Sequence, residues 1–417
     1  MTDEIELNGR SYRVPARPTV VICADGFDPA YLEAGLAAGV LPAMAEWRRS
    51  GFCAVADAAM PTFTNPNNMS IVTGAAPDVH GISGNFALDR DTGREIMMTD
   101  PAMLRSDTIL ALMSRAGVPV AAITAKDKLR AMLGRGLRIG AGAICFSSER
   151  ADRCAKEEHG IVDVETLVGR PAPNMYSADL SLFVLDAGIR LVEQGRSQLL
   201  YLSLSDYVQH GHAPDEPEAL AFHRALDERL ARFVELGCTV AVTADHGMND
   251  KALADGRPHV LYLEDILGAQ FGDGAARVIC PITDPFVRHH GALGSFVRVY
   301  RRNGASVTDM LHAIGALPGI DRVLTREEAC AAFELPFDRE ADLVVTGDRN
   351  TVIGATAAEH DLAGLAGHRL RSHGGSFEQR VPFLLSHALA PEYIAISESR
   401  RLRNFDIFDA ALNGVVP

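Results

Sequence analysis

The chain has 417 residues, of which 47% are hydrophobic and 23% are charged, which is ordinary for a globular protein. Its net charge of −14 argues against nucleic acid or an anionic membrane surface as the main partner, and no apolar run is long enough to predict a transmembrane helix. An apolar signal segment is absent from the N-terminus and the seven cysteines form no C-x-x-C motif, so we expect a cytoplasmic protein with free thiols.

The first part of the chain alternates predicted strands with predicted helices. Apolar, β-branched runs predict strands, and apolar residues that recur every three or four positions predict helices. The expected strands are residues 18–24, 53–59, 119–124, 199–205 and 238–244. The expected helices are residues 30–50, 65–73, 107–115, 182–193 and 216–236. This order predicts an α/β fold, with a mostly parallel sheet and helices on both of its faces.

The alternation weakens after about residue 255. Strands are expected at residues 277–282, 294–300 and 343–345, and helices at 306–316 and 326–333. We interpret residues 270–350 as a smaller, inserted α+β cap, and residues 1–269 and 351–417 as the core. A strand at 381–385 and a helix at 404–412 would complete the core, and Pro382 predicts an edge position for that strand.

Acidic residues and histidines follow three of the predicted strands. They are Asp25, Asp206 with His210 four positions later, and the pair Asp245 and His246. Ligands of open α/β sheets gather at the carboxyl ends of the strands, so we expect these side chains to converge. Three carboxylates would repel one another and raise their pKa values unless a divalent cation is bound. The combination of Asp oxygen and His nitrogen favours zinc.

Two of these residues have close competitors. His212 could replace His210, but the four-residue spacing from Asp206 to His210 puts both on one face of a helical turn. Asp28 could replace Asp25, but its place before Pro29 is better suited to a helix N-cap. We therefore favour Asp25 and His210 as ligands.

His373 is a further candidate ligand near the C-terminus. Two glycines follow it, which favours a tight turn that lets the backbone approach a ligand, and His360 and His368 are its rivals. The remaining histidines are expected on the surface or in the core, away from the site: His80, His159, His223, His259, His289, His290, His312 and His387.

Thr64 is the candidate nucleophile. It stands at the expected start of a helix, where free N–H groups and the positive end of the helix dipole favour an anion. Beside a metal its hydroxyl could ionise and attack an electrophile. The simpler interpretation is that Thr64 only caps this helix.

The motifs around Thr64 carry a family resemblance. Residues 64–74 read TNPNNMSIVTG, and residues 80–85 read HGISGN. Together with the order Asp, Thr, Asp-x-x-x-His, Asp-His, His across residues 18–375, they resemble the nucleotide pyrophosphatase/phosphodiesterase branch of the alkaline phosphatase superfamily. The resemblance implies an alkaline-phosphatase-like fold and two zinc ions per subunit, replaceable by Mn²⁺ or Fe²⁺.

The resemblance also implies roles for individual residues. One zinc ion would be held by Asp25, Thr64, Asp245 and His246. The other would be held by Asp206, His210 and His373. In the same branch, the position of Asn85 contacts a phosphoryl oxygen.

Lys126 and Lys128 narrow the resemblance within the superfamily. These lysines follow the strand at 119–124, and Thr-Asn-Pro-Asn replaces the usual Thr-Phe-Pro-Asn of phosphodiesterases. Both features are most similar to the phosphonoacetate hydrolase family. This similarity implies hydrolysis of the carbon–phosphorus bond of phosphonoacetate to acetate and phosphate, through a phospho-threonine intermediate at Thr64. The two lysines would bind the substrate carboxylate, although a solvated loop is their simpler interpretation.

Other functions remain as alternatives. The first is a zinc-dependent phosphodiesterase or nucleotide pyrophosphatase with the same metals. A phosphate mutase or sulfatase is a second, and a metal-binding protein without catalysis is a third. The expected partner is a small organophosphonate, and a homodimer is the candidate assembly.

Overall fold

The computed structural model describes residues 3–284, 290–365 and 367–416. Its largest sheet has seven strands. From one edge to the other these are β4 (Phe52–Asp57), β19 (Arg380–Leu385), β10 (Thr239–Thr243), β3 (Thr19–Cys23), β9 (Leu199–Ser203), β7 (Val120–Thr124) and β8 (Ile144–Ser147). The strands from β10 to β8 run parallel, whereas β19 is antiparallel to both of its neighbours. The predicted α/β fold with a mostly parallel sheet is confirmed.

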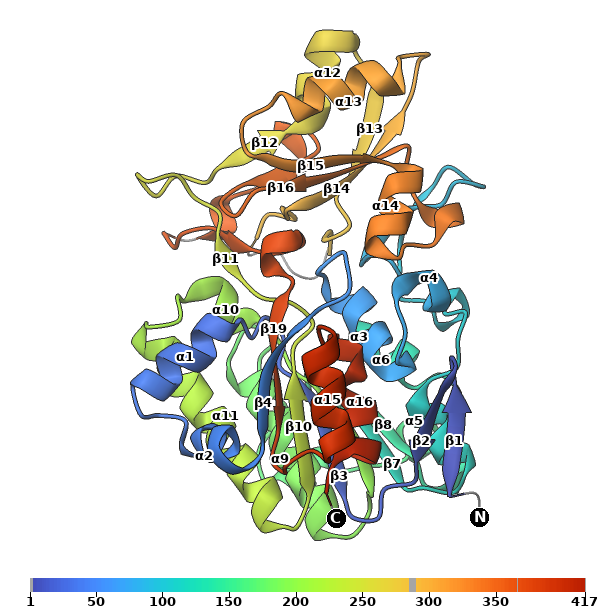
Figure 1. The fold of residues 1–417 in the computed structure, drawn as a ribbon, viewed down its shortest axis with the longest axis vertical. Coiled ribbons are helices and arrows are strands. Elements are labelled where there is room, and N and C mark those ends of the chain that lie inside the picture. The colour runs from blue at the N-terminus through green and yellow to red at the C-terminus, as the bar shows by residue number, and fades with distance from the viewer. Residues whose placement is uncertain (1–2, 285–289, 366, 417) are drawn as a thin grey trace.

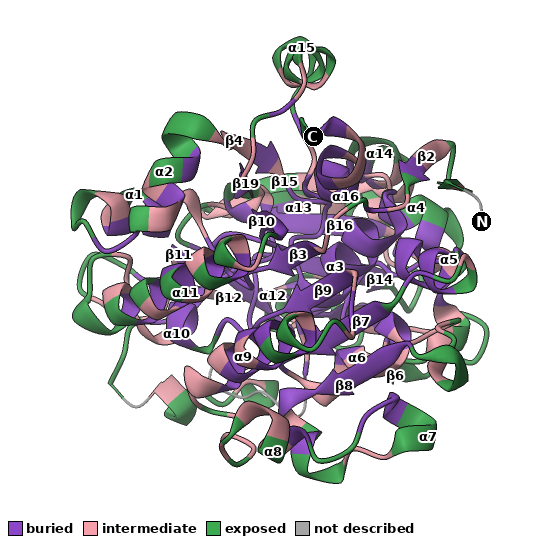
Figure 2. Ribbon diagram, turned by 90° about the horizontal axis from the view of Figure 1, so that it is seen from below, coloured by how far each residue is buried: buried purple, intermediate pink, exposed green. Residues whose placement is uncertain are grey.

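Helices cover both faces of this sheet (Figures 1 and 2). One face packs against α1 (Pro29–Ala37), α2 (Pro42–Ser50), α9 (Asp179–Glu193) and α11 (Pro217–Glu235). The other packs against α3 (Thr64–Thr73), α5 (Ile109–Arg115) and α16 (Ile407–Asp409). Because the central strands are covered on both sides, every residue of β3, β7, β9 and β10 is buried, and each strand is an apolar run in the sequence.

A second, antiparallel sheet lies at the far end of the molecule from the two termini (Figure 1). Its four strands are β13 (Ala276–Ile279), β14 (Phe296–Arg301), β16 (Leu343–Gly347) and β15 (Ile320–Thr325). It has its own apolar cluster, to which the helices α12 (Leu263–Phe271), α13 (Val307–Gly315) and α14 (Arg326–Phe333) contribute. Met60 and Phe63, which precede α3, belong to this second cluster and join it to the large sheet's side of the molecule.

The predicted edge position of the strand around Pro382 was wrong. That strand, β19, lies between β4 and β10. It pairs with β4 along its whole length but with β10 only at Leu384 and Leu385. Pro382 lies outside the part paired with β10, so its missing N–H costs this ladder no hydrogen bond.

Two other local expectations differ from the structure. The single helix expected at residues 30–50 is two helices, because Gly39 adopts a left-handed φ of 68° and Pro42 starts α2. The N-terminal segment, for which no strand or helix was predicted, forms a hairpin of β1 (Glu4–Leu7) and β2 (Arg10–Arg13). Asn8 and Gly9 both have positive φ, and this Asn-Gly pair was the available hairpin signal. Within the described part of the chain, no helix is both long and apolar enough to cross a membrane.

Candidate active site

The predicted ligands lie together at one end of the large sheet. Asp25, Asp206 and Asp245 come two or three residues after β3, β9 and β10, and none is more than 3% exposed. His373 arrives from a distant part of the sequence. It follows β18 (Arg371–Ser372), which pairs with β11 (Asn249–Asp250) just after His246.

Asp25, Asp206 and His246 form one group of ligand atoms. One atom from each lies within 4.8 Å of the others, and His246 Nε2 is 3.2 Å from Asp25 Oδ1. Asp245 adjoins this group, with Oδ2 3.7 Å from His246 Nε2. Both carboxylate oxygens of Asp25 and Oδ2 of Asp245 are buried and make no hydrogen bond within the described residues. Buried oxygens without a donor are costly, so this group fits a bound cation.

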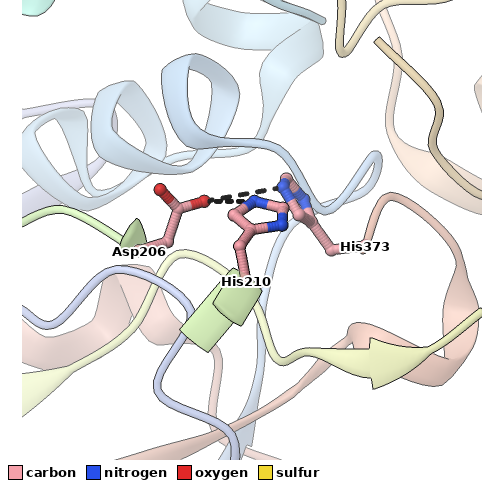
Figure 3. Close-up of side chains that lie close together, drawn as sticks. All are labelled: Asp206, His210 and His373. Carbon is pink, nitrogen blue, oxygen red and sulfur yellow. Dashed lines mark ion pairs between the residues drawn. The ribbon is translucent and has the colours of Figure 1, made fainter. Parts of the chain in front are cut away.

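Asp206, His210 and His373 form a second group, in which both rings face the carboxylate (Figure 3). The Nε2 atoms of His210 and His373 are 2.8 and 3.9 Å from Asp206 Oδ2. Asp206 is the N-cap residue of α10 (Tyr207–Gly211), and His210 lies one turn later on it. The four-residue spacing therefore places both side chains on one face of a helical turn, as the sequence predicts.

All three imidazoles are oriented by backbone carbonyls. Nδ1 of His210 lies 2.8 Å from Arg371 O, Nδ1 of His246 lies 2.9 Å from Gly247 O, and Nδ1 of His373 lies 2.7 Å from Thr62 O. A carbonyl only accepts, so each Nδ1 carries the proton. Nε2 of a neutral ring is then the lone-pair atom that faces the carboxylates. This tautomer is the one a metal requires, with its other nitrogen held by a fixed acceptor.

The pKa values of these ligands reflect burial and the repulsion between neighbouring carboxylates. Burial and the charge of Asp25 raise the pKa of Asp245 above its ordinary value. Burial opposes protonation of His246, but the carboxylates of Asp245 and Asp25 outweigh it and raise the pKa of the ring. His373 stacks on His246 with ring centroids 3.5 Å apart, and burial together with His246 lowers its pKa. A divalent cation would relieve the repulsion between the carboxylates.

Thr64 is the first residue of α3 and is 8% exposed. Phe63 is the N-cap residue, so the structure does not support the simpler interpretation of Thr64 as a cap. Asn85 lies beside it, because Asn65 N–H donates to Asn85 Oδ1 at 3.0 Å. This hydrogen bond joins the motif at residues 80–85 to Asn65, the residue after the candidate nucleophile.

Lys126 and Lys128 are partly buried rather than solvated, with side chains 13% and 10% exposed. Lys126 Nζ is 3.1 Å from Asp206 Oδ1, and Lys128 forms an ion pair with Asp284. Burial lowers the pKa of Lys126, but Asp206, Asp25 and Asp284 raise it by more, so the ammonium stays charged. A cavity of about 150 Å³ opens here, lined by Lys126, Asp127, Lys128, Glu149, Arg150, Met175 and Asp284.

The rivals of the predicted ligands have other partners. His212 is 3.0 Å from Glu216, and its ring contacts that of His368. Asp28 accepts from Ala30 N–H as the N-cap of α1. His360 Nδ1 lies 2.8 Å from Gly291 O.

Two residues at the site were missed by sequence reasoning. Asp284 pairs with Lys128, and His290 is buried with its ring 5.1 Å from that of His210. His290 was expected away from the site, which was wrong. Asp284 comes two residues after the strand expected at 277–282, and this position was the signal that could have found it. His289, expected away from the site, lies outside the described residues.

Comparison with known proteins identifies the family of the chain. The chain matches the family model of type I phosphodiesterase / nucleotide pyrophosphatase over residues 19–375. It is similar to phosphonoacetate hydrolase from Sinorhizobium meliloti, solved in complex with phosphonoformate and with phosphonoacetate, at 46% identity over 100% of both chains and a TM-score of 0.93. Murine ectonucleotide pyrophosphatase / phosphodiesterase 5, in an inactive form in complex with AMP, is 17% identical over 96% of each chain with a TM-score of 0.63, which shows a shared fold. The resemblance predicted from the motifs is confirmed.

Proposed function

The chain belongs to the type I phosphodiesterase / nucleotide pyrophosphatase family, and we propose that it hydrolyses the carbon–phosphorus bond of phosphonoacetate to acetate and phosphate. The similarity to a phosphonoacetate hydrolase over the full length of both chains supports this activity. The observation that supports phosphonoacetate as the substrate is the position of Lys126, whose ammonium is 3.1 Å from the candidate ligand Asp206. A cation this close to the metal groups suits a substrate with a carboxylate two bonds from phosphorus.

We propose two zinc ions, for which Mn²⁺ or Fe²⁺ could substitute. One would be held by Asp25, Thr64, Asp245 and His246, and the other by Asp206, His210 and His373. The Asp25 oxygens, which accept no hydrogen bond from the described residues, and the Nδ1-protonated rings support this assignment. Bound divalent cations would neutralise the carboxylates, lower the pKa of the Thr64 hydroxyl and withdraw charge from the phosphoryl group.

In the first step, the Thr64 Oγ1 attacks phosphorus while the carbon–phosphorus bond breaks. The bonding electrons leave with carbon and delocalise onto the carboxylate as an enediolate. Lys126 and Lys128 would stabilise this growing charge, and an interaction that strengthens in the transition state accelerates the reaction. The proton lost by Thr64 is balanced by the one that the leaving carbon gains as acetate forms.

In the second step, water attacks the phosphorus of phospho-threonine. The bond between phosphorus and Oγ1 breaks, phosphate is released, and Thr64 regains its hydroxyl. Asn85 would hold a phosphoryl oxygen through both steps, and its bond from Asn65 N–H supports this position beside the nucleophile. The start of α3 adds free N–H groups that favour the charged phosphoryl group.

Residues 270–350 would act as a cap over this site. Asp284 comes from this segment and pairs with Lys128, and the apolar cluster of the second sheet includes Phe63, next to Thr64. Both contacts support a cap that excludes water from the carbanion.

The seven cysteines are free thiols, which supports the proposed location in the reducing cytoplasm.

The test is phosphate release from phosphonoacetate by the zinc-loaded protein. A bis-aryl phosphate ester and methylphosphonate, which lacks the carboxylate, are the comparison substrates. Release from phosphonoacetate alone is the expected result. Release from the ester alone would instead assign the chain to the phosphodiesterase alternative.

A further inference from the structure

A fully buried ion pair lies behind the loops that carry the candidate metal ligands. Lys251 and Glu378 are both 0% exposed, and Lys251 Nζ is 2.8 Å from Glu378 Oε1. Lys251 Nζ also donates to Arg349 O at 2.9 Å. Burying such a pair costs more free energy than burying apolar residues of the same size, so its presence calls for a reason other than stability.

The Glu378 carboxylate connects two loops. Its Oε1 accepts from Asn249 Nδ2 at 2.7 Å, and Asn249 comes three residues after His246. Its Oε2 accepts from Gly375 N–H at 3.1 Å, and Gly375 comes two residues after His373. The backbone adds a third bond, from Gly247 N–H to Glu378 O at 2.7 Å. One residue thus fixes the separation of the chains that bring His246 and His373 into contact.

The second of these loops continues to the nucleophile. Thr62 Oγ1 donates to Gly375 O at 3.0 Å and accepts from Gly374 N–H at 3.0 Å. Thr62 is two residues before Thr64, and its carbonyl accepts from His373 Nδ1. A displacement of the loop at Gly375 would therefore move His373 and the start of α3 together.

We infer that Glu378, neutralised by Lys251, is a positioning residue for the two metal-binding loops. It touches no proposed ligand side chain and acts through backbone N–H groups and Asn249. The carboxylate accepts from Lys251 Nζ, Asn249 Nδ2 and Gly375 N–H at once, which an amide cannot. Glu378 has this role only if the metal site proposed above exists, so the test reads metal retention and not turnover alone.

The main variant is Glu378→Gln, which keeps the shape but turns one acceptor into an N–H donor that opposes another donor. The zinc-loaded protein is mixed with the chromophoric chelator 4-(2-pyridylazo)resorcinol, and zinc transfer is followed without substrate. We expect transfer about tenfold faster than in the wild type, the lower end of what partners behind metal ligands contribute. We also expect kcat for phosphonoacetate to fall while KM changes little.

The chain offers a matched control in a second buried ion pair. Arg298 and Glu340 are each 0% exposed and 2.7 Å apart, in the segment of the second sheet. Among the described residues, no hydrogen bond or ion pair joins this pair to either metal-binding loop, and Arg298 also donates to Ser83 O at 3.0 Å. Glu340→Gln should lower the melting temperature but leave zinc transfer at the wild-type rate. Equal acceleration in both variants would reduce Glu378 to a general stability role and overturn the inference.

A milder variant keeps the test decisive if Glu378→Gln does not fold. Asn249→Ala removes one donor and leaves the ion pair intact, so zinc transfer should accelerate by a smaller factor. Wild-type zinc retention in folded Glu378→Gln, or in Asn249→Ala if that is the only folded variant, would overturn the inference. Zinc binding by the wild type without release of phosphate from phosphonoacetate would overturn the proposed function but leave this measurement valid.

Discussion

The two ends of the site are built differently. The nucleophile segment, residues 61–74, is held by packing and by uncharged hydrogen bonds. Every residue of α3 is buried, and the Asn67 side chain accepts from Ala59 N–H and donates to Ala59 O. The lysine segment, residues 126–128, instead holds its charges on carboxylates that belong to other parts of the site, Asp206 and Asp284. The proposed phosphoryl end is therefore preformed, whereas the proposed carboxylate end would have to exchange ion-pair partners when substrate binds.

This difference separates rate from specificity. Groups fixed in advance stabilise a transition state without reorganisation at the moment of reaction. Charges that must change partners discriminate between substrates, because only a ligand with its own carboxylate replaces the partner that is lost. Changes at the preformed end should affect all substrates, and changes at the other end should affect phosphonoacetate most.

The largest effect on turnover is expected when the hydroxyl of Thr64 is removed from the preformed end. Thr64→Ala removes the nucleophile, so phosphate release from phosphonoacetate and from an aryl phosphate ester should both fall by about 10³-fold or more. Thr64→Ser is the control, because it keeps a hydroxyl on the same backbone and should retain part of the activity. Near-normal turnover by Thr64→Ala would exclude it as the nucleophile.

The next effect tests the end that exchanges partners. Lys126→Ala or Lys128→Ala should lower kcat/KM for phosphonoacetate by about 100-fold, as expected for a lost hydrogen bond to a charged group. An aryl phosphate ester, which has no carboxylate, should be affected far less. Steady-state kinetics on both substrates make the comparison, and equal losses on both would reject the proposed role of the lysines.

A third prediction concerns acid stability next to the loop that carries Asp25. His223 is 1% exposed and stacks on Phe27, two residues after Asp25, and burial lowers the pKa of His223 to about 4. The unfolded chain then binds more protons than the folded one between pH 6.5 and 4, so stability is lost as the pH falls through this window. For His223 the loss between pH 7 and pH 5 is about 2 kcal/mol.

Denaturant unfolding at pH 7 and pH 5 measures this loss. His223→Leu has no proton to bind, so its free energy of unfolding should fall by about 2 kcal/mol less than that of the wild type over the same interval. Its stability at pH 7 serves as the internal reference, because cavity effects act equally at both values. An identical pH dependence in the two proteins would contradict the assigned protonation state.

The smallest effect is expected on KM, when Asp284 of the proposed cap is changed. Asp284→Asn removes the buried charge that competes with substrate for Lys128, so KM for phosphonoacetate should decrease roughly two- to fivefold, a change of about 0.5–1 kcal/mol in binding free energy. The KM for an aryl phosphate ester should stay constant. A higher KM for phosphonoacetate would mean that Asp284 orients the lysine rather than competes for it.

The sequence by itself determined the large sheet and the order of the residues at its end. Buried parallel strands are apolar runs, and Asp25, Asp206 and Asp245 follow three of them directly, so local pattern was enough to predict that they meet. The spacing from Asp206 to His210 was equally local, because one helical turn sets it.

Only the tertiary structure decided what came from far along the chain. His373 reaches the site through the pairing of β18 with β11, Asp284 and His290 arrive from the segment of the second sheet, and Glu378 joins the loops from behind. The inner position of β19 could not be predicted from Pro382 either. A proline prevents pairing only where its own N–H would be needed, and Pro382 lies in the part of β19 that does not pair with β10. Such contacts depend on how separate elements pack, and local periodicity carries no information about that.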